Sequence, residues 1–487
     1  MALHRVLPDQ PVADLADHRA RGGGRGLEVA RRLGADGTIE HLEAAGLRGR
    51  GGAGFPTGTK WRTVVEYRSA TTPTTVVVNG AEGEPGSFKD RALLRADPYA
   101  VLEGAAIAAE TIGADTVIVA LKHSFEAERR RVADAIDEVT AAGWFPGASV
   151  RVVAGPSAYL FGEETALLEV VDGRGPFPRV APPYRQGAES LGDQDGQTGQ
   201  VVLAGPGEST SAPPALANNV ETMANVGPIL AEGPDAFRAV GTDGSPGTMV
   251  FTVTGATDHH GVGELALGTP AAEVIERVGC GVLADREAAF VLSGVSNPVL
   301  LAADLDTPAS FEGLAAAGAG LGAAGFIVHD DRTDPVAVAL GVARFLSVES
   351  CGQCTPCKQD GLAIAAALAE LAGHPGEQTS DDTLDRVHLA LETVADGARC
   401  ALGRQQQDVI GSLLAAFPAA FEARAEAGAD AGPLASVLVA PIVDLHDGRA
   451  VLDGRQADKQ PDWSFDDVDS GQSPIDRLGH ESPVTIG

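Results

Sequence analysis

The first half of the chain alternates short β-branched apolar runs with longer segments in which apolar residues recur at helical spacing. The runs at residues 75–79, 116–121 and 149–154 are typical of buried strands. Residues 93–112 and 124–142, which lie between them, have the spacing of helices. Strand, helix and strand in this order make a parallel α/β unit with right-handed connections. The pattern therefore predicts an α/β domain built on a parallel sheet.

The apolar pattern changes in the second half of the chain. Residues 247–255 and 288–293 are strand-like, and residues 270–278 are helical. Thr269 is the expected N-cap of that helix, and Pro270 then stands at the first helical position, where a missing N–H costs nothing. This combination predicts a small α+β domain.

From Asp334 to about residue 427 the spacing is helical almost throughout. One apolar stripe contains Leu384, Val387, Leu391 and Val394, and a second contains Val409, Leu413, Phe417 and Phe421. Pro418 is expected to kink the last helix. The pattern predicts a helical domain.

Three segments lack a clear period. Residues 1–40 are rich in Arg and Gly and are expected to form a loosely packed lead-in. Residues 186–212 are rich in Gly, Gln, Ser and Asp and are predicted to form a long mobile loop. The tail from residue 428 is acidic and contains one strand-like run at residues 436–443.

Composition limits the class of protein. The chain has 487 residues, which is too long for one ordinary core and predicts roughly two to four domains. Its formal charge of −31 argues against nucleic-acid binding, because phosphate contacts need a basic face. No stretch resembles a signal peptide, and no run reaches the roughly 20 apolar residues of a spanning helix. The sequence therefore predicts a soluble, cytoplasmic protein without direct membrane insertion.

Four of the five cysteines have the spacing of a metal centre. Cys351, Cys354 and Cys357 form a C-x2-C-x2-C run, and Cys400 follows later in the chain. Thiolates at this spacing converge on one iron–sulfur cluster, with the fourth ligand supplied from elsewhere. Zinc is the alternative, although zinc sites usually take paired C-x2-C units. Cys280 has no partner spacing and is expected to be an ordinary core residue.

A glycine-rich loop at residues 49–54 follows a helical segment at residues 39–47. It satisfies the G-x-G-x-x-G pattern, but the dinucleotide motif must follow a strand and open a helix. A P-loop is excluded, because Lys60 does not follow a glycine directly. Clustered glycines still let backbone N–H groups approach a flat or phosphorylated ligand. A tight turn without a ligand is the alternative.

Two further loops carry candidate chemistry. The loop at residues 79–91 has carboxylates at Glu82 and Glu84 and lies at the carboxyl end of a predicted strand, where open parallel sheets bind ligands. The turn at residues 159–165 places two adjacent glutamates at a helix start. The alternatives are a solvated salt-bridge cluster for the first loop and favourable interaction with the helix dipole for the second.

Lysine is scarce in this chain. Only five of the 36 basic residues are lysines, and two of them, Lys60 and Lys89, lie in the glycine-rich and acidic motifs. A compact ammonium suits a phosphate or a ring carbonyl better than a planar guanidinium does.

Taken together, five motifs in one unbroken order resemble a known family. They are residues 48–61, 79–91, 159–165, 218–222 and 349–357. The chain resembles, from about residue 41 to residue 424, the NADH-binding flavoprotein subunit of respiratory complex I. The diaphorase subunits of NAD-linked hydrogenases and formate dehydrogenases share these motifs.

The resemblance implies a domain organisation. It places an α/β Rossmann-like domain for FMN and NADH at residues 41–240 and a small ubiquitin-like α+β domain at residues 241–333. A four-helix bundle carrying a [4Fe–4S] cluster is implied at residues 334–427. The lead-in at residues 1–40 and the acidic tail at residues 428–487 lie outside it.

The resemblance also implies site residues and a reaction. Those expected to bind the cofactor are Gly49, Arg50, Gly51, Gly54, Phe55, Lys60, Asn79, Glu82, Tyr159, Gly162, Glu163, Asn218, Asn219 and Thr222. Glu84 and Glu164 are expected to orient the nicotinamide end of NADH, and Phe55 to face the nucleotide. The implied reaction is hydride transfer from NADH to FMN, followed by single-electron transfer through the cluster to other electron-transfer subunits or a ferredoxin-like protein. Any attachment to a membrane is then made through partner subunits.

Some positions depart from the family pattern. Ala81 stands where the family has an aspartate that contacts the flavin. Thr63, Ala181 and Tyr184 replace residues that hold the adenine side of NADH. These changes keep an alternative open, in which the chain relays electrons from a ferredoxin-like protein without turning over a nicotinamide nucleotide.

Overall fold

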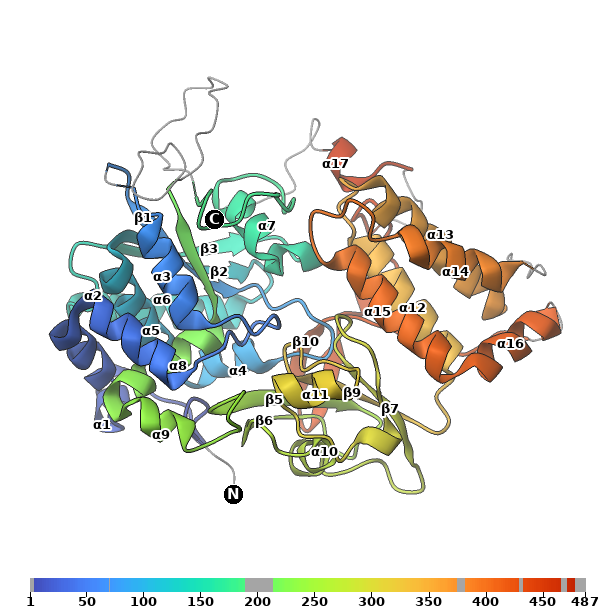
Figure 1. Ribbon diagram of the computed structural model, residues 1–487, viewed down its shortest axis with the longest axis horizontal. Coiled ribbons are helices and arrows are strands. Elements are labelled where there is room, and N and C mark those ends of the chain that lie inside the picture. The colour runs from blue at the N-terminus through green and yellow to red at the C-terminus, as the bar shows by residue number, and fades with distance from the viewer. Residues whose placement is uncertain are drawn as a thin grey trace.

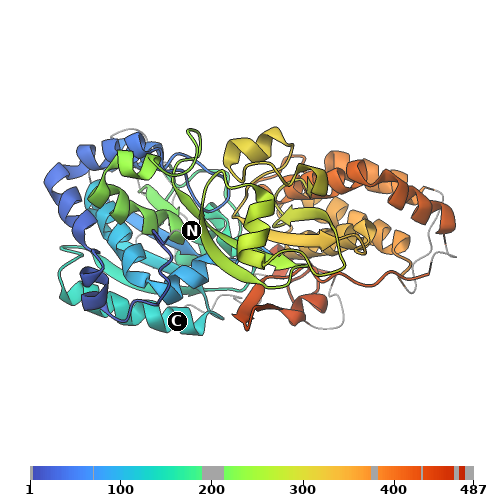
Figure 2. The ribbon, with the colours of Figure 1, turned by 90° about the horizontal axis from the view of Figure 1, so that it is seen from below.

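The computed structural model describes residues 4–69, 71–188, 213–374, 382–428, 432–465 and 471–477. A parallel sheet with its helices, a second mixed sheet and a group of helices lie next to one another (Figure 1). Viewed from below, the parallel sheet and the helical group lie at opposite ends of the molecule, with the mixed sheet between them (Figure 2).

The first sheet consists of β1 (Thr74–Gly80), β2 (Ala114–Lys122), β3 (Ser149–Gly155) and β4 (Ala215–Asn219). The strand order is β3-β2-β1-β4, and every pairing is parallel. The order reverses between β1 and β4, which makes the carboxyl ends of these two strands a topological switch point, where open α/β sheets bind ligands. The three predicted strands are confirmed.

Helices cover both faces of this sheet. They are α3 (Thr57–Glu66), α4 (Lys89–Ala96), α5 (Pro98–Ile112), α6 (Glu126–Ala141), α7 (Glu164–Val171) and α8 (Val220–Glu232). The prediction of one helix over residues 93–112 is wrong. The Asp97 carboxylate accepts hydrogen bonds from the N–H groups of Tyr99 and Ala100, and Pro98 occupies the first position of α5. This cap ends α4 and starts a new helix.

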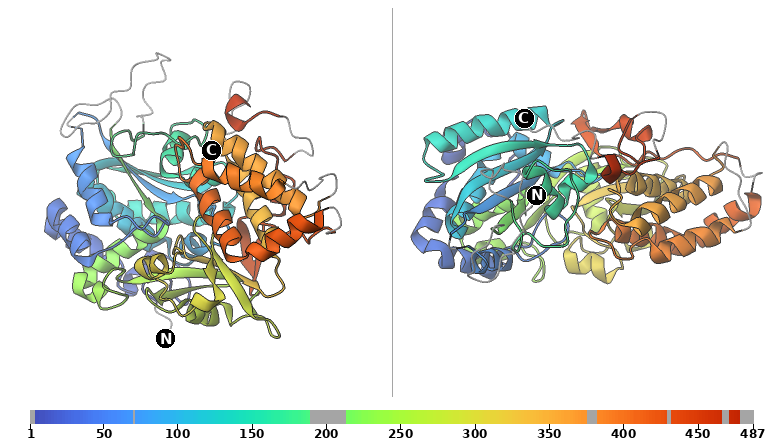
Figure 3. Two further views of the ribbon diagram at one scale, coloured as in Figure 1. Left: turned by 45° about the vertical axis from the view of Figure 1, so that its right-hand side comes forward. Right: turned by 90° about the horizontal axis from the view of Figure 1, so that it is seen from above.

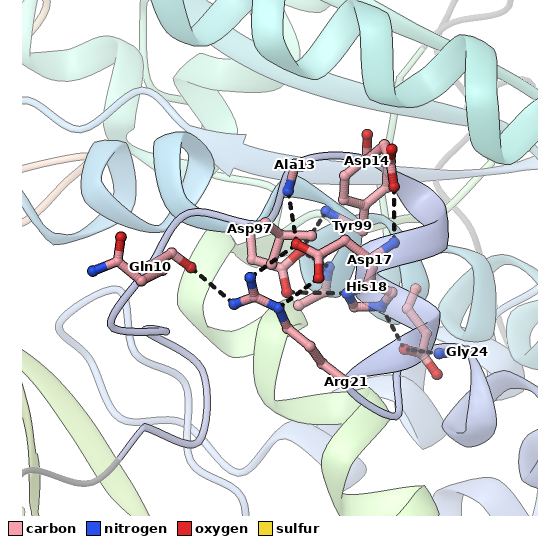
Figure 4. A network of polar contacts seen from close by, with 12 residues as sticks. Gln10, Ala13, Asp14, Asp17, His18, Arg21, Gly24, Asp97 and Tyr99 are labelled. Atoms are coloured by element: carbon pink, nitrogen blue, oxygen red, sulfur yellow. Dashed lines mark hydrogen bonds and ion pairs between the residues drawn. The ribbon is translucent and has the colours of Figure 1, made fainter.

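The first forty residues are not loosely packed, which corrects the prediction for the lead-in. They form α1 (Leu15–Ala20) and most of α2 (Arg25–Ala45), and α2 packs against α5 and α8. Val12 and Leu27 are buried in the same core as the sheet residue Val76. The side chain of His18 lies in a network of polar contacts that includes Asp97 (Figure 4).

The mixed sheet contains β5 (Thr248–Gly255), β6 (Gly261–Ala266), β7 (Ala288–Ser293), β8 (Leu300–Leu301) and β9 (Gly325–Asp330), in the order β6-β5-β9-β7-β8. The short helices α9 (Pro234–Arg238), α10 (Ala271–Gly279) and α11 (Phe311–Ala316) lie beside it. The predicted strands and helix are confirmed, but the predicted cap is wrong by one residue. Pro270, not Thr269, occupies the N-cap position, with extended backbone.

The helical group contains α12 (Pro335–Glu349), α13 (Thr355–Leu371), α14 (Thr383–Thr393), α15 (Leu402–Ala416) and α16 (Pro418–Ala427). The predicted apolar stripes face its core, where Val387, Val409 and Phe421 are buried. Pro418 does not kink a helix but begins one, because the first helical position needs no N–H.

The tail also has ordered structure. It forms a hairpin of β10 (Ile442–His446) and β11 (Arg449–Leu452), the short turn η4 (Gly454–Ala457) and α17 (Pro474–Arg477). The strand predicted at residues 436–443 is therefore largely wrong, because pairing begins only at Ile442. Figure 3 shows this segment at the junction of the sheet-containing part and the helical part.

Residues 189–212 of the predicted mobile loop lie outside the described residues. Within the described part of the chain, no helix combines the length and the apolar character needed to cross a membrane.

Candidate functional site

A cavity of about 400 Å³ opens at the carboxyl ends of β1 and β4. All three parts of the molecule contribute to its wall. The glycine-rich loop and the loop after β1 form one side, the mixed sheet forms a second side through Asn297 and Gly322, and α15 closes a third side through Gln405. The position agrees with the topological switch point of the parallel sheet.

Two asparagines stand at the base of the cavity. Asn79 and Asn219 are paired in register at the ends of β1 and β4. The Asn79 amide donates to the carbonyl of Gly162 at 2.9 Å. Asn219 caps α8 through the N–H of Glu221, and its amide donates to Asp90 at 2.6 Å. Both side chains are therefore fixed by protein contacts at the edge of the sheet.

The acidic loop supplies one wall. The Glu82 carboxylate accepts from the N–H groups of Asp90 (3.1 Å) and Arg91 (3.3 Å), at the start of α4. Burial raises the pKa of Glu82, and the neighbouring Asp90 carboxylate adds to the rise. Ala81, which replaces the family's aspartate, is fully buried in the same wall.

Lys89 is the buried cation of this wall. Its ammonium forms ion pairs with Asp90 at 2.7 Å and Glu221 at 2.9 Å. Burial alone would lower the pKa of Lys89, but the two carboxylates outweigh burial and raise it. The lysine is therefore charged, and its charge is already compensated within the protein.

Tyr159 and Glu84 form the opposite polar contact. The Tyr159 hydroxyl donates to Glu84 at 2.6 Å and accepts from the Gln405 amide at 3.0 Å. The other Glu84 oxygen accepts from the N–H of Val295 at 2.7 Å. Burial raises the pKa of Glu84, and these hydrogen bonds oppose the rise. Burial, together with the Glu84 carboxylate, also raises the pKa of Tyr159 well above its usual value.

The predicted turn at residues 159–165 is brought to the cavity in part. Gly162 and Glu163 line the wall, and Glu163 caps α7 by accepting from the N–H groups of Thr165 and Ala166. Glu164 does not line the wall. It forms a short ion pair with Lys60, whose ammonium also donates to the Ala217 carbonyl at 2.7 Å.

The glycine-rich loop reaches the cavity through its middle. Gly51 and Gly52 line the wall, whereas Gly49 closes the loop by donating its N–H to the Phe55 carbonyl at 2.8 Å. Gly54 has a φ of +62°, and a Cβ there would come within 2.6 Å of the Phe311 ring. Phe55 is 54% exposed and lies outside the wall.

Four other predicted residues support the wall from behind. The N–H of Arg50 donates to the Thr222 hydroxyl at 2.8 Å, and burial lowers the pKa of the Arg50 guanidinium to about 10. The side-chain carbonyl of Asn218 accepts from the Trp61 indole at 2.9 Å. Burial lowers the pKa of Lys60 to about 8, an effect that the adjacent Glu164 carboxylate opposes.

The predicted cysteines come together next to this cavity. Cys351, Cys354, Cys357 and Cys400 all line one small adjoining space between the start of α13 and the turn before α15. Burial raises the pKa of Cys351, Cys357 and Cys400, the last to about 12. These thiols ionise only where a cation, such as cluster iron, stabilises the thiolate.

The two spaces share a wall. Leu160, Cys400 and Leu402 line both the cavity and the cysteine site. Among the described residues, no three His, Cys, Asp or Glu side chains are placed to bind one metal ion. A [4Fe–4S] cluster takes one thiolate on each iron, so its ligands need not meet at a single atom.

Several lining residues were missed from the sequence. Ser296, Asn297, Gly322 and Ala323 come from the mixed sheet, and Arg404 and Gln405 from α15. They stand in no local motif, and only tertiary packing brings them to the carboxyl edge of the parallel sheet. Thr63, Ala181 and Tyr184, by contrast, do not line the cavity.

Comparison with known protein families gives two matches. Residues 42–228 match the Nuo51 FMN-binding domain, and residues 337–424 match the iron–sulfur binding region of NADH-ubiquinone oxidoreductase F. The second NADH-quinone oxidoreductase F-subunit of Rhizobium meliloti (strain 1021) is 35% identical over 401 residues, covering 80% of this chain and 89% of the relative. The corresponding F-subunit of Streptomyces coelicolor (strain ATCC BAA-471 / A3(2) / M145) is 33% identical over 409 residues, covering 82% and 85%.

A solved structure agrees with these matches. A chain of NAD+-reducing [NiFe]-hydrogenase in the air-oxidized state superposes with a TM-score of 0.71 at 32% identity, covering 85% of this chain and 67% of that one. The two family matches fall on the parallel-sheet part and on the helices that carry the cysteines. The chain therefore belongs to the NADH-quinone oxidoreductase F-subunit family of FMN- and iron–sulfur-binding proteins.

Proposed function

We propose that the chain is an electron-transfer flavoprotein subunit that oxidises NADH. A hydride, which carries two electrons, passes from NADH to FMN, and the electrons leave one at a time through a [4Fe–4S] cluster to a partner. The observation that carries the proposal is the shared wall of the cavity and the cysteine site, which includes the cluster ligand Cys400. FMN supplies the exchange between two-electron and one-electron chemistry when it is bound.

The cavity fits FMN by its shape and its donors. Gly51, Gly52 and Gly83 line the wall without side chains, so backbone N–H groups can reach a flat ligand. The Asn79 and Asn219 side chains add fixed polar groups at one end. We propose that these five residues, with Glu82 and Gly162, hold the flavin, and that Arg50, Lys60, Asn218 and Thr222 support them.

The cysteine site fits a cluster by its donor set. Four thiols face one space, and no other residue of that space has an ionisable side chain except Arg399. We propose that Cys351, Cys354, Cys357 and Cys400 are the four ligands. The protein's part is to exclude water and to fix the thiols on the start of α13 and the turn before α15.

Glu84 is the residue we assign to the nicotinamide end of NADH. It lines the cavity with its carboxylate held from two sides, by the Tyr159 hydroxyl and the Val295 N–H. A carboxylate fixed in this way can orient a carboxamide and hold the ring against the flavin. Glu164, paired with Lys60 behind the wall, acts instead through that lysine.

The domain division follows the same reasoning. We propose an FMN and NADH domain at residues 41–240, a ubiquitin-like domain at residues 241–333 and a four-helix cluster domain at residues 334–427. The separate parallel sheet, mixed sheet and helical group support these boundaries. We also propose cytoplasmic work within a multi-subunit oxidoreductase, with a ferredoxin-like protein as one candidate acceptor.

The test is anaerobic titration of the purified, cofactor-loaded protein with NADH. Loss of flavin absorbance, followed by an EPR signal from the reduced cluster, is the expected result. Glu84→Gln should slow flavin bleaching without lowering FMN content, whereas Glu273→Gln on the exposed face of α10 should change neither. If millimolar NADH never bleaches the wild-type flavin but a reduced ferredoxin does, the relay function replaces this proposal.

A further inference from the structure

The C-terminal segment lies beyond both family matches, which end at residue 424. We call its described residues, 432–465 and 471–477, the strap. The strap touches the parallel-sheet part, where the Arg91 guanidinium donates to the carbonyls of Ile442 (3.2 Å) and Val443 (2.6 Å). It also touches the mixed-sheet part, where the N–H of Ala450 donates to the His260 ring at 2.9 Å.

The strap then reaches the cysteine loop. Lys358, which follows the ligand Cys357 directly, donates to the Pro461 carbonyl at 2.5 Å. Ser473 packs onto Gly352, since a Cβ on that glycine would lie 2.5 Å from the Ser473 Cβ. The same segment therefore contacts all three parts and covers one side of the loop between the first two ligands (Figure 3).

Lys459 is the innermost charged residue of the strap. Its side chain is only 5% exposed, and its ammonium pairs with Glu349, whose side chain is 2% exposed, at 2.6 Å. The second Glu349 oxygen accepts from the backbone N–H of Tyr159 at 2.9 Å. Both oxygens of this buried carboxylate are thus engaged, one by the strap and one by the cavity wall.

Glu349 occupies a junction between the two sites. It is the last residue of α12 and stands two positions before the ligand Cys351. Tyr159, which it holds through the backbone, donates its hydroxyl to Glu84 in the cavity. A continuous chain of contacts therefore runs from Lys459 through Glu349 and Tyr159 to Glu84, and Lys459 itself touches neither cofactor site.

We infer that Lys459 is a positioning residue for hydride and electron transfer, supplied by a segment outside the family core. By fixing Glu349, it sets the backbone of Tyr159 and the start of the Cys351 loop together. A buried carboxylate stripped of its cation does not keep the same orientation, because it must find other partners or water. The inference rests on the proposed function and adds the residue that couples the strap to it.

Lys459→Met tests the inference, because methionine keeps the apolar stem and removes the ammonium. In the cofactor-loaded protein, the rate constant of flavin bleaching at saturating NADH should fall about tenfold or more, since small displacements of orienting groups have effects of that size. The dissociation constant for NADH should change less than about threefold, because Lys459 acts on orientation rather than on binding. The EPR spectrum of the reduced cluster should change as well.

Two further variants sharpen the test. In the double variant Lys459→Met with Glu349→Gln, the amide carbonyl can still accept from the Tyr159 N–H, so bleaching should recover to within about threefold of the wild type. Arg455→Ala is the matched control within the strap, because its guanidinium contacts only Asp453 and Phe465 of the strap itself. That variant should behave as the wild type does.

The inference is overturned if Lys459→Met bleaches at the native rate with a native EPR spectrum. It is equally overturned if the rate falls only in proportion to lost FMN or iron, or if limited proteolysis shows that the strap has detached while bleaching is native. If NADH fails to bleach even the wild-type flavin, the proposed function fails. The EPR spectrum after chemical reduction then decides the inference by itself, with an unchanged spectrum in Lys459→Met counting against it.

Discussion

The Tyr159 hydroxyl and the Glu84 carboxylate are joined by a hydrogen bond of 2.6 Å across the wall of the cavity. Tyr159 lies in η1 (Tyr159–Gly162), directly after β3, and Glu84 lies in the loop after β1. The contact therefore links two neighbouring loops at the carboxyl edge of the sheet, and it stabilises the ionised form of a buried acid.

Tyr159→Phe is expected to move the pH dependence of the reductive half-reaction. The lost hydroxyl favours the ionised form of Glu84, whose pKa burial already raises, so its removal raises the pKa further. The acid limb of the pH profile for flavin bleaching should shift to higher pH. Single-turnover measurements across the pH range check this, and a shift to lower pH would contradict the assigned role of the hydrogen bond.

Cys400→Ser is expected to remove or change the cluster signal. Cys400 lines the cysteine space and also the wall of the flavin cavity, so both sites should respond. Iron and sulfide analysis, with EPR of the reduced protein, measures the loss. Cys280→Ser is the control, because Cys280 is exposed at the end of α10 and lies in neither space. Zinc at one equivalent with no iron would refute the assignment.

His18 should make stability depend on pH. Burial would lower the pKa of His18, but hydrogen bonds to Asp97 and Glu103 outweigh burial and raise it from 6.5 to about 9. Because the folded pKa exceeds the unfolded one, the stabilisation is fully present below pH 6.5 and is lost as the pH rises through about 9. Its size is roughly 3 kcal/mol.

Thermal midpoints of the wild type and His18→Gln, measured from pH 6 to about pH 10, check this expectation. The difference between the two proteins should be largest at the acid end and should vanish at the alkaline end. A constant difference across the range would mean that the contacts shown in Figure 4 do not depend on the charge of His18.

Lys89→Met is expected to destabilise the cavity wall by about 3–5 kcal/mol, because it leaves the buried Asp90 and Glu221 carboxylates without their cation. FMN content after purification should fall with the thermal midpoint. Arg277→Met is the matched control, since that residue forms an exposed pair with Glu273 worth less than about 1 kcal/mol. Equal effects of the two substitutions would contradict the role of burial.

The parallel sheet could be predicted from the sequence where its strands are rich in β-branched residues, as in residues 75–79. The fourth strand, Ala215–Asn219, was missed because its sequence Ala-Leu-Ala-Asn-Asn has no β-branched residue, and only pairing with β1 makes it a strand. The break between α4 and α5 had a signal, an aspartate before a proline, that a strong helical period concealed.

The site divides in the same way. Cys351, Cys354 and Cys357 could be assigned because their function depends on local spacing. Gln405 and Asn297 could not, because they reach the cavity from α15 and from the mixed sheet, and nothing near them in sequence marks them as site residues. Long-range packing thus supplies the half of the cavity that local motifs do not describe.

The strap has a consequence for the order of assembly. Its residues leave the ribosome after all three parts that they join, and segments made earlier generally fold earlier. The cysteine loop at Gly352 is therefore uncovered while the sheets and helices form, and Ser473 closes over it only afterwards. During synthesis the cluster has an open route to its four thiols, and the arrival of Lys459 completes the mature protein around cofactors that are already in place.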